Sequence, residues 1–169
     1  MLKIFLQKAA AVCNSLLTFE IVLAYLISSM GISMEIDIWY EGDLSTRCVD
    51  RATGTEIRTD APKDNQGLGR MFSPTDLVAV ALGSCMLTLM GIAANRLKVE
   101  IKGTKLTIQK QMQSVPVRRI GGFEVVVDCP YTFSSSIAQE LIRAAEGCPV
   151  KHSLHPDIQW KCQFLWGQL

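Results

Sequence analysis

Apolar and polar residues alternate along several stretches after residue 34, and this period of two predicts β-strands. Residues 36–40 show the pattern first, and residues 44–50 and 55–59 repeat it on either side of a Thr-Gly pair. Short alternating runs joined by such turn residues are typical of an antiparallel meander. Residues 60–71 contain one proline and two glycines with mixed charges, and we expect a loop there.

The longest apolar run predicts a helix with a well-marked beginning. Ser73 can cap it, Pro74 suits its first position, and Asp76 completes a variant of the capping box. We expect this helix to run to about Leu97, roughly 35 Å at 1.5 Å per residue. Residues 77–94 carry no charge, so we expect the helix to be buried all round, at the centre of a packed dimer. Eighteen uncharged residues also meet the length of a membrane span, which is the competing interpretation.

The second half of the chain predicts further antiparallel strands and a pair of helices. The apolar residues fall at odd-numbered positions before Gly103 and at even-numbered positions after it, which predicts a bulge or a strand break there. Gly147 is a natural residue to end a helix. The expected strands are 98–112, 123–129 and 158–166, and the expected helices are 134–147 and 149–154. Together with the meander and the long helix, this pattern predicts an α+β fold.

The first 33 residues differ from the rest of the chain. Two lysines precede an apolar stretch that Asn14 and Glu20 interrupt. Three interpretations stay open: a chain that functionally begins at Met34, a signal or membrane anchor, and an amphipathic helix. We therefore divide the sequence into an apolar extension, 1–33, and one domain, 34–169. The domain is expected in the cytoplasm, and a membrane association or export is expected only if the extension is retained.

Composition excludes several classes of function. The net charge is +1, which gives no electrostatic reason to expect a nucleic-acid partner. Six cysteines lie at positions 13, 48, 85, 129, 148 and 162 without a CxxC pair, so neither a structural zinc site nor a disulfide scaffold is favoured. We expect no cofactor, and we expect four of the six cysteines to behave as small buried hydrophobes.

Cys85 and Cys148 are the two candidates for thiol chemistry. Cys148 precedes a short helix with Lys151 and His152 in its first turn, which favours its thiolate, although a packing role explains it equally well. Cys85 lies within the apolar helix, where a core role is more usual and where desolvation raises a thiol pKa. A reactive Cys85 needs a positive partner, and the arginines near it in sequence are Arg58, Arg70 and Arg96.

These cysteine motifs resemble those of a known family. The run from Ser73-Pro74-Thr75-Asp76-Leu77 to Gly83-Ser84-Cys85 is similar to the central-helix signature of the OsmC/Ohr superfamily, with cysteine eleven positions after the proline. Cys148-Pro149-Val150 resembles the second cysteine motif, as it reads in the OsmC-like (YhfA-type) branch. The resemblance extends in order over about 34–169 and leaves the extension outside it.

The resemblance implies an intertwined homodimer, with antiparallel sheets around two long central helices. It implies a thiol-dependent peroxidase in which Cys85 attacks a hydroperoxide, Cys148 closes a disulfide, and a dithiol reductant resets the pair. Asp76 falls where many members have Glu, and Arg70, or alternatively Arg58, is the candidate cation. Apolar residues around Cys85 in sequence (Leu82, Met86 and Leu89) predict a preference for organic hydroperoxides.

Three rival functions stay open from the sequence. The first is a thiol-based sensor or small-molecule binding protein on the same fold, with little peroxide turnover. The second is a non-catalytic dimer whose cysteines are packing residues. The third is a membrane-anchored protein, which depends on the first 33 residues.

Overall fold

The computed structural model describes residues 34–167. The predictions for residues 1–33, whether a late start, an anchor or a helix, lie outside the described residues. The chain divides into two compact units. The described part of the first comprises residues 34–38 and Cys48–Glu56, and the second comprises Trp39–Arg47 together with the residues from Ile57 onward.

The predicted meander is confirmed. Strands β1 (Ile36–Gly42), β2 (Ser45–Asp50) and β3 (Glu56–Asp60) form a sheet in that order. In the first unit, Arg51 binds both carboxylate oxygens of Asp37 at 2.7 Å. The loop after β3 contains a short 3-10 helix, η1 (Lys63–Asn65), that the sequence did not predict.

Helix α3 (Pro74–Leu97) has the predicted bounds, and it begins at Pro74 because its first turn carries a complete capping box. The Asp76 amide donates to Ser73 Oγ at 3.2 Å, and the Ser73 amide donates to Asp76 Oδ2 at 2.8 Å. Both bonds satisfy helix-terminal N–H groups that have no partner within the helix.

One chain covers only part of α3, so burial of the helix all round, at the centre of a dimer, stays a prediction. Leu82, Met86 and Met90 are fully buried. On the uncovered side of the helix, Val80 is 45% exposed and Ile92 is 60% exposed. Of the helices in residues 34–167, α3 alone is long and apolar enough to cross a membrane, a property that the core helices of soluble proteins share.

The second sheet lies in the second unit and has the order β4-β5-β6, formed by Lys105–Gln113, Arg119–Cys129 and Gln159–Trp166. Its two pairings differ, because β4 and β5 are antiparallel whereas β5 and β6 are parallel. The expectation of purely antiparallel sheets is therefore wrong for β6. The chain between β5 and β6 forms α4 (Ser135–Glu146) and α5 (Pro149–His152), and such a crossover brings a strand back in a parallel direction.

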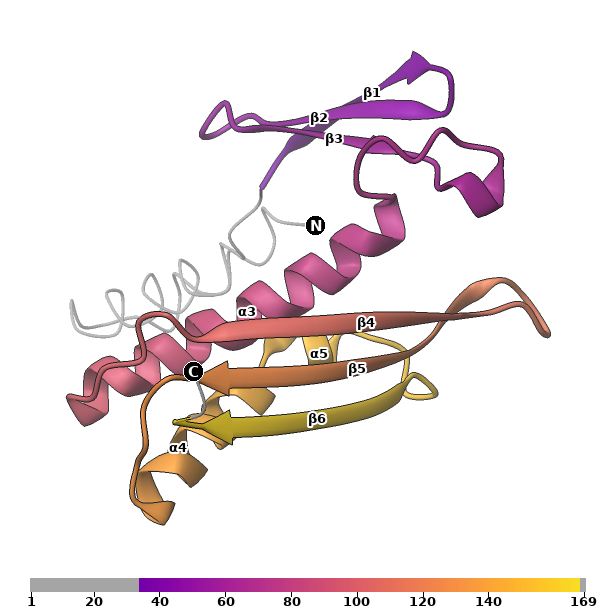
Figure 1. The fold of residues 1–169 in the computed structure, drawn as a ribbon. Helices are drawn as coiled ribbons and strands as arrows, with labels where there is room; N and C mark the ends of the chain where they lie inside the picture. Colours follow the sequence, from indigo (N-terminus) through magenta and orange to yellow (C-terminus); the bar gives the residue numbers. More distant parts are fainter. Residues whose placement is uncertain (1–33, 168–169) are drawn as a thin grey trace, which may run out of the picture. The chain divides into compact units, whose positions relative to one another are not determined.

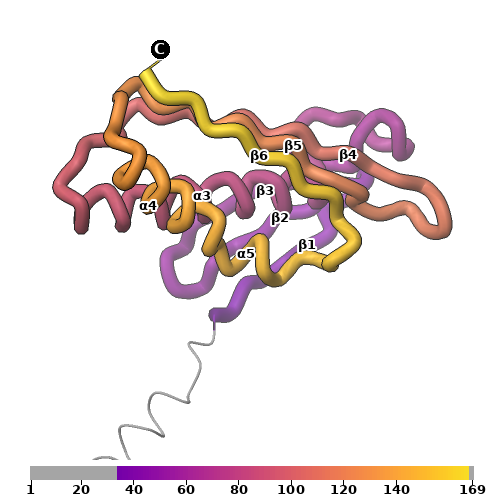
Figure 2. Tube along the Cα trace, turned by 90° about the horizontal axis from the view of Figure 1, so that it is seen from below, coloured from indigo at the N-terminus to yellow at the C-terminus, as the bar shows by residue number. Residues whose placement is uncertain are grey.

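The helices and the second sheet form two layers, with α3 and α4 on the same face of the sheet (Figures 1 and 2). Phe123, Val125 and Val127 of the central strand β5 are at most 2% exposed, and they belong to one core with Leu82 and Leu141. Of the bulge or strand break predicted near Gly103, the structure has a break: the expected strand 98–112 begins only at Lys105. The register of β4 and β5 shifts later, between Gln111 and Met112. Gly103 instead lies in the turn before β4 with a φ of 89°, a backbone conformation that favours glycine.

Candidate functional site

The fold brings Cys85 and Cys148 together from positions 63 residues apart. Cys85 is half-buried in the middle of α3, and Cys148 is completely buried at the N-cap of α5. The two thiols are close enough for Cys85 to raise the pKa of Cys148, and the Cys148 Sγ lies 3.9 Å from the backbone oxygen of Leu82. Two neighbouring free thiols, one of them accessible, can interconvert with a disulfide.

The electrostatics of Cys148 differ from the expectation of a favoured thiolate. Burial raises the pKa of the Cys148 thiol, and the neighbouring Cys85 thiol raises it further. The backbone N–H groups of Lys151 and Val150 lower it, as expected at a helix N-terminus, but they do not outweigh burial. The Lys151 ammonium lies 4.7 Å from the centre of the Trp160 ring and makes a cation–π contact there. In the reduced protein Cys148 therefore favours the neutral thiol.

Asp76 helps to hold the beginning of α3 and is paired with a residue that sequence reasoning missed. Lys110 donates to Asp76 Oδ1 at 2.6 Å and to Thr75 Oγ1 at 2.7 Å. Burial raises the pKa of Asp76, but the hydrogen bonds from Lys110 and Ser73 outweigh it and hold the pKa below its usual range. Asp76 precedes Cys85 by nine residues, which corresponds to about 14 Å along the helix.

Lys110 carried a signal in the sequence. Lys110 lies on the same side of β4 as Leu106 and Ile108, the side that faces the core. A charged residue on the core-facing side of a strand needs a partner of opposite charge, because its burial is otherwise unfavourable. That partner, Asp76, comes from 34 residues earlier in the chain.

The arginines proposed to support Cys85 have acidic partners. Arg70 binds the fully buried Asp60 through its Nε at 2.8 Å, and its backbone amide donates to the same carboxylate at 3.0 Å. The Arg70 hydrogen bond is the largest cause that lowers the pKa of Asp60. Arg58 binds Glu41 at 3.1 Å, and Arg96 binds Glu140 at 3.3 Å.

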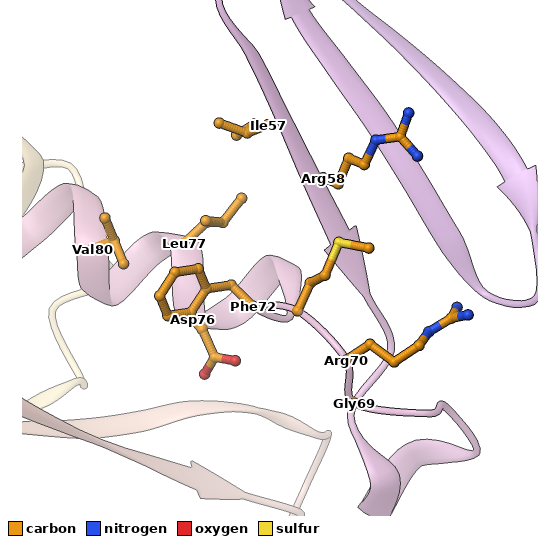
Figure 3. A pocket seen from close by; sticks show the side chains of 9 residues that line it. Ile57, Arg58, Gly69, Arg70, Phe72, Asp76, Leu77 and Val80 are labelled. Atoms are coloured by element: carbon orange, nitrogen blue, oxygen red, sulfur yellow. The ribbon is translucent and has the colours of Figure 1, made fainter.

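A hollow of about 740 Å³ lies within the second unit where β3, the loop after it and the first turns of α3 meet (Figure 3). Its apolar lining includes Phe72, Ile57 and Met71, which are exposed at 60%, 48% and 41%. Arg58 and Arg70 also line it, but their charged groups point away from Asp76. The hollow is therefore a largely apolar surface with charges at its edge.

Other parts of the described chain supply no competing centre. Residues 34–167 contain no group of three or more His, Cys, Asp or Glu side chains that could hold a metal ion. Cys129 is buried in the core, and burial raises the pKa of Cys162 to about 11. Two of the apolar residues expected beside the reactive thiol, Leu82 and Met86, are fully buried in the core, so of the three only Leu89 can flank a substrate.

Comparison with known proteins identifies relatives of the whole domain. The family model described as OsmC-like protein matches residues 66–163. A candidate osmotic stress induced and detoxification response protein from Psychrobacter arcticus is 38% identical, with a TM-score of 0.74, over 80% of this chain and 97% of that chain. A comparison with curated proteins found no match.

More distant structures share the fold at low identity. An organic hydroperoxide resistance protein OsmC from Legionella pneumophila is 14% identical, with a TM-score of 0.65 over 80% of this chain and 98% of that chain. The organic hydroperoxide resistance protein OhrB of Bacillus subtilis is 18% identical, with a TM-score of 0.57 over 79% of this chain and 98% of that chain. These two comparisons establish the fold.

Proposed function

Because the chain belongs to the OsmC family, we propose that it is a thiol-dependent peroxidase that reduces organic hydroperoxides through Cys85 and Cys148. The observation that carries this proposal is that two free thiols from distant motifs are neighbours, near enough for one to raise the pKa of the other. The names of the structures from Legionella pneumophila and Bacillus subtilis support a role of this fold in hydroperoxide resistance.

Cys85 is the better candidate for the first step because its side chain is half-buried while Cys148 is not exposed at all. The Cys85 thiolate attacks the terminal peroxide oxygen, the O–O bond breaks, and the departing alkoxide takes a proton to become an alcohol. Cys85 is then a sulfenic acid. Cys148 attacks its sulfur, the S–O bond breaks, and the hydroxyl leaves as water as the disulfide forms. A dithiol reductant restores both thiols by exchange.

The electrostatics of Cys148 suit a resolving thiol that acts second. In the reduced protein its neutral form is favoured by burial and by the Cys85 thiol. Oxidation of Cys85 to sulfenic acid removes that thiol, while the amides of Val150 and Lys151 still favour a thiolate. The Cys148 thiolate is therefore easier to form once its target exists.

The proposed site is completed by a second copy of the chain. A single chain leaves an apolar face of α3 and the hollow around Phe72 open, and a homodimer would cover both. We expect an interface of about 2,000 Å² or more, in the range of obligate dimers. In that dimer we propose Arg70, whose side chain is 46% exposed although paired with Asp60, as the cation for the Cys85 thiolate, and Asp76 as the residue that positions α3. Sedimentation that finds a monomer at micromolar concentration would contradict the dimer.

The test of the peroxidase uses cumene hydroperoxide with a dithiol reductant. Cys85→Ser should abolish peroxide consumption, whereas Cys148→Ser should permit one oxidation and leave sulfenic or sulfinic acid on Cys85, detected by mass spectrometry. Cys162→Ser is the matched control, since Cys162 lies on β6 and has no part in the mechanism. Turnover that survives Cys85→Ser, or two thiols unmodified after peroxide treatment, would refute the proposal.

A thiol sensor on the same fold is the second candidate. The raised pKa of Cys148 and the acidic partners of Arg70 and Arg96 favour slow turnover. A sensor should form the disulfide once per chain and then consume no further peroxide when a dithiol reductant is present in excess. Continuous consumption excludes it.

A further inference from the structure

Helix α5 follows Cys148 directly, but little within this helix holds it in place. It has four residues, Pro149–His152, and no side chain caps its beginning. Its backbone hydrogen bonds join the His152 amide to the Cys148 oxygen at 3.1 Å and the Ser153 amide to the Pro149 oxygen at 3.0 Å. A helix this short is unstable in isolation, so the position of Cys148 depends on contacts between α5 and the rest of the unit.

One of these contacts comes from Lys151, whose side chain reaches from α5 to the second sheet. The Lys151 ammonium lies 4.7 Å from the centre of the Trp160 ring, on β6. Trp160 and Cys162 are two residues apart and share the core-facing side of that strand. Burial raises the pKa of Cys162, and the Lys151 charge lowers it in part. Both observations place the Lys151 ammonium over the same side of β6.

Trp160 uses the face of its ring in this contact and not its N–H group. Trp160 Nε1 is buried, and within residues 34–167 it has no hydrogen-bond partner. A buried tryptophan usually finds a partner for this N–H, so a hydrogen bond does not account for the residue type at this position. What tryptophan provides here is a ring face that binds a cation better than the faces of tyrosine or phenylalanine do.

We propose that Lys151 is a positioning residue, and that its contact with Trp160 is a latch that keeps α5 closed and Cys148 buried beside Cys85. Val150 and Leu154 also pack against the core, so the latch adds to an apolar contact. Resting on the proposed function, the latch presents Cys148 to the oxidised Cys85 and withholds it from peroxide and from other thiols.

The experiment measures how often α5 opens and uses no peroxide, so failure of the peroxidase proposal does not affect its outcome. The full chain with Cys85→Ser, which removes the neighbouring thiol, reacts with the neutral reagent N-ethylmaleimide, and peptide mass spectrometry follows Cys148 and Cys129. Both thiols are 0% exposed, so each reacts only after an opening. Cys129 lies on β5 in the core and reports opening of the whole domain.

Adding Lys151→Met should speed the modification of Cys148 by about two- to fivefold, the factor that corresponds to one cation–π contact, and should leave Cys129 unchanged. Lys151→Arg should keep the original rate, because a guanidinium binds the same ring face. Lys161→Met is the matched control. Lys161 follows Trp160 directly but pairs with Glu124, on the other side of the sheet, and its replacement should change neither rate.

Two other roles of Lys151 predict different results. An electrostatic role predicts slower modification after Lys151→Met, since loss of a positive charge near Cys148 disfavours its thiolate. A general structural role predicts that Cys148 and Cys129 become faster together. In a Trp160→Leu background, Lys151→Met should cause no further increase, because the latch is already absent. Slower or unchanged modification of Cys148, a parallel increase at Cys129, or an increase that persists without Trp160 would each overturn the proposal.

Discussion

The substitution Ser73→Ala should destabilise the protein through the beginning of α3. Ser73 is only 2% exposed, and its hydroxyl accepts from the Asp76 amide at 3.2 Å and donates to Asp76 Oδ2 at 2.7 Å. Alanine removes both bonds and leaves the Asp76 amide without its capping partner. Because α3 carries Cys85, this cap also holds the helix on which the candidate site is built.

The expected loss is about 1.5–2 kcal/mol. Replacement of a capping serine by alanine costs about 0.5–2 kcal/mol in general. We place this site in the upper part of that range because the cap is buried and one of the two lost bonds is to a carboxylate. For a chain of this size, each kcal/mol lowers the melting temperature by about 2–4 °C, so Ser73→Ala should lower it by about 3–8 °C.

Ser134→Ala provides a matched control, because Ser134 occupies the same position at the beginning of α4 but makes no capping hydrogen bond there. Its hydroxyl contacts only Ser136, on the exposed surface. We expect a change within about 0.5 kcal/mol. The measurement is urea unfolding followed by tryptophan fluorescence, at one protein concentration because subunit association changes apparent stability. Equal losses for the two variants would refute the reasoning that the hydrogen bonds, and not the residue type, stabilise the helix.

Three further predictions follow from burial and charge. Phe123→Ala should lower the free energy of unfolding by about 3–5 kcal/mol, measured by the same urea titration, because Phe123 is 1% exposed in the core. Lys110→Met should raise the pKa of Asp76 in the folded protein. The lowered pKa of Asp76 stabilises the fold at pH values above about 3.9, and this stabilisation is lost as the pH falls through that lowered pKa. Acid unfolding of Lys110→Met, followed by circular dichroism, should therefore begin at a higher pH than in the wild type. Cys162, with a pKa raised to about 11, should react with iodoacetamide at pH 8 roughly tenfold or more slowly than free cysteine, as measured by peptide mass spectrometry.

Local signals in the sequence predicted the elements that carry the site. The beginning of α3 depends on Ser73, Pro74 and Asp76, which lie within four residues of each other, and the structure confirms it. The N-cap position of Cys148 likewise follows from Cys148-Pro149 and the glycine before it. Such signals act through hydrogen bonds and dihedral preferences of neighbouring residues, so they can be evaluated without knowledge of the fold.

Contacts between distant residues needed the tertiary structure. The sequence offered serines at the beginnings of both α3 and α4, but only Ser73 caps, because its hydroxyl is held in a buried network with Asp76. The direction of the Cys148 pKa depended on how fully the fold excludes water from that thiol. The partners of Arg70 and Lys110 were equally beyond the reach of local spacing, since they lie 10 and 34 residues away.

The sequence by itself therefore determined the type and order of the main elements, where α3 begins, and which two cysteines to examine, because capping and periodicity act over a few residues. Only the tertiary structure decided that β6 runs parallel to β5, that Asp76 pairs with Lys110, and that burial outweighs the helix N-terminus at Cys148. These features depend on which distant groups are packed together and on how much water they exclude, and neither quantity is encoded in the spacing of neighbouring residues.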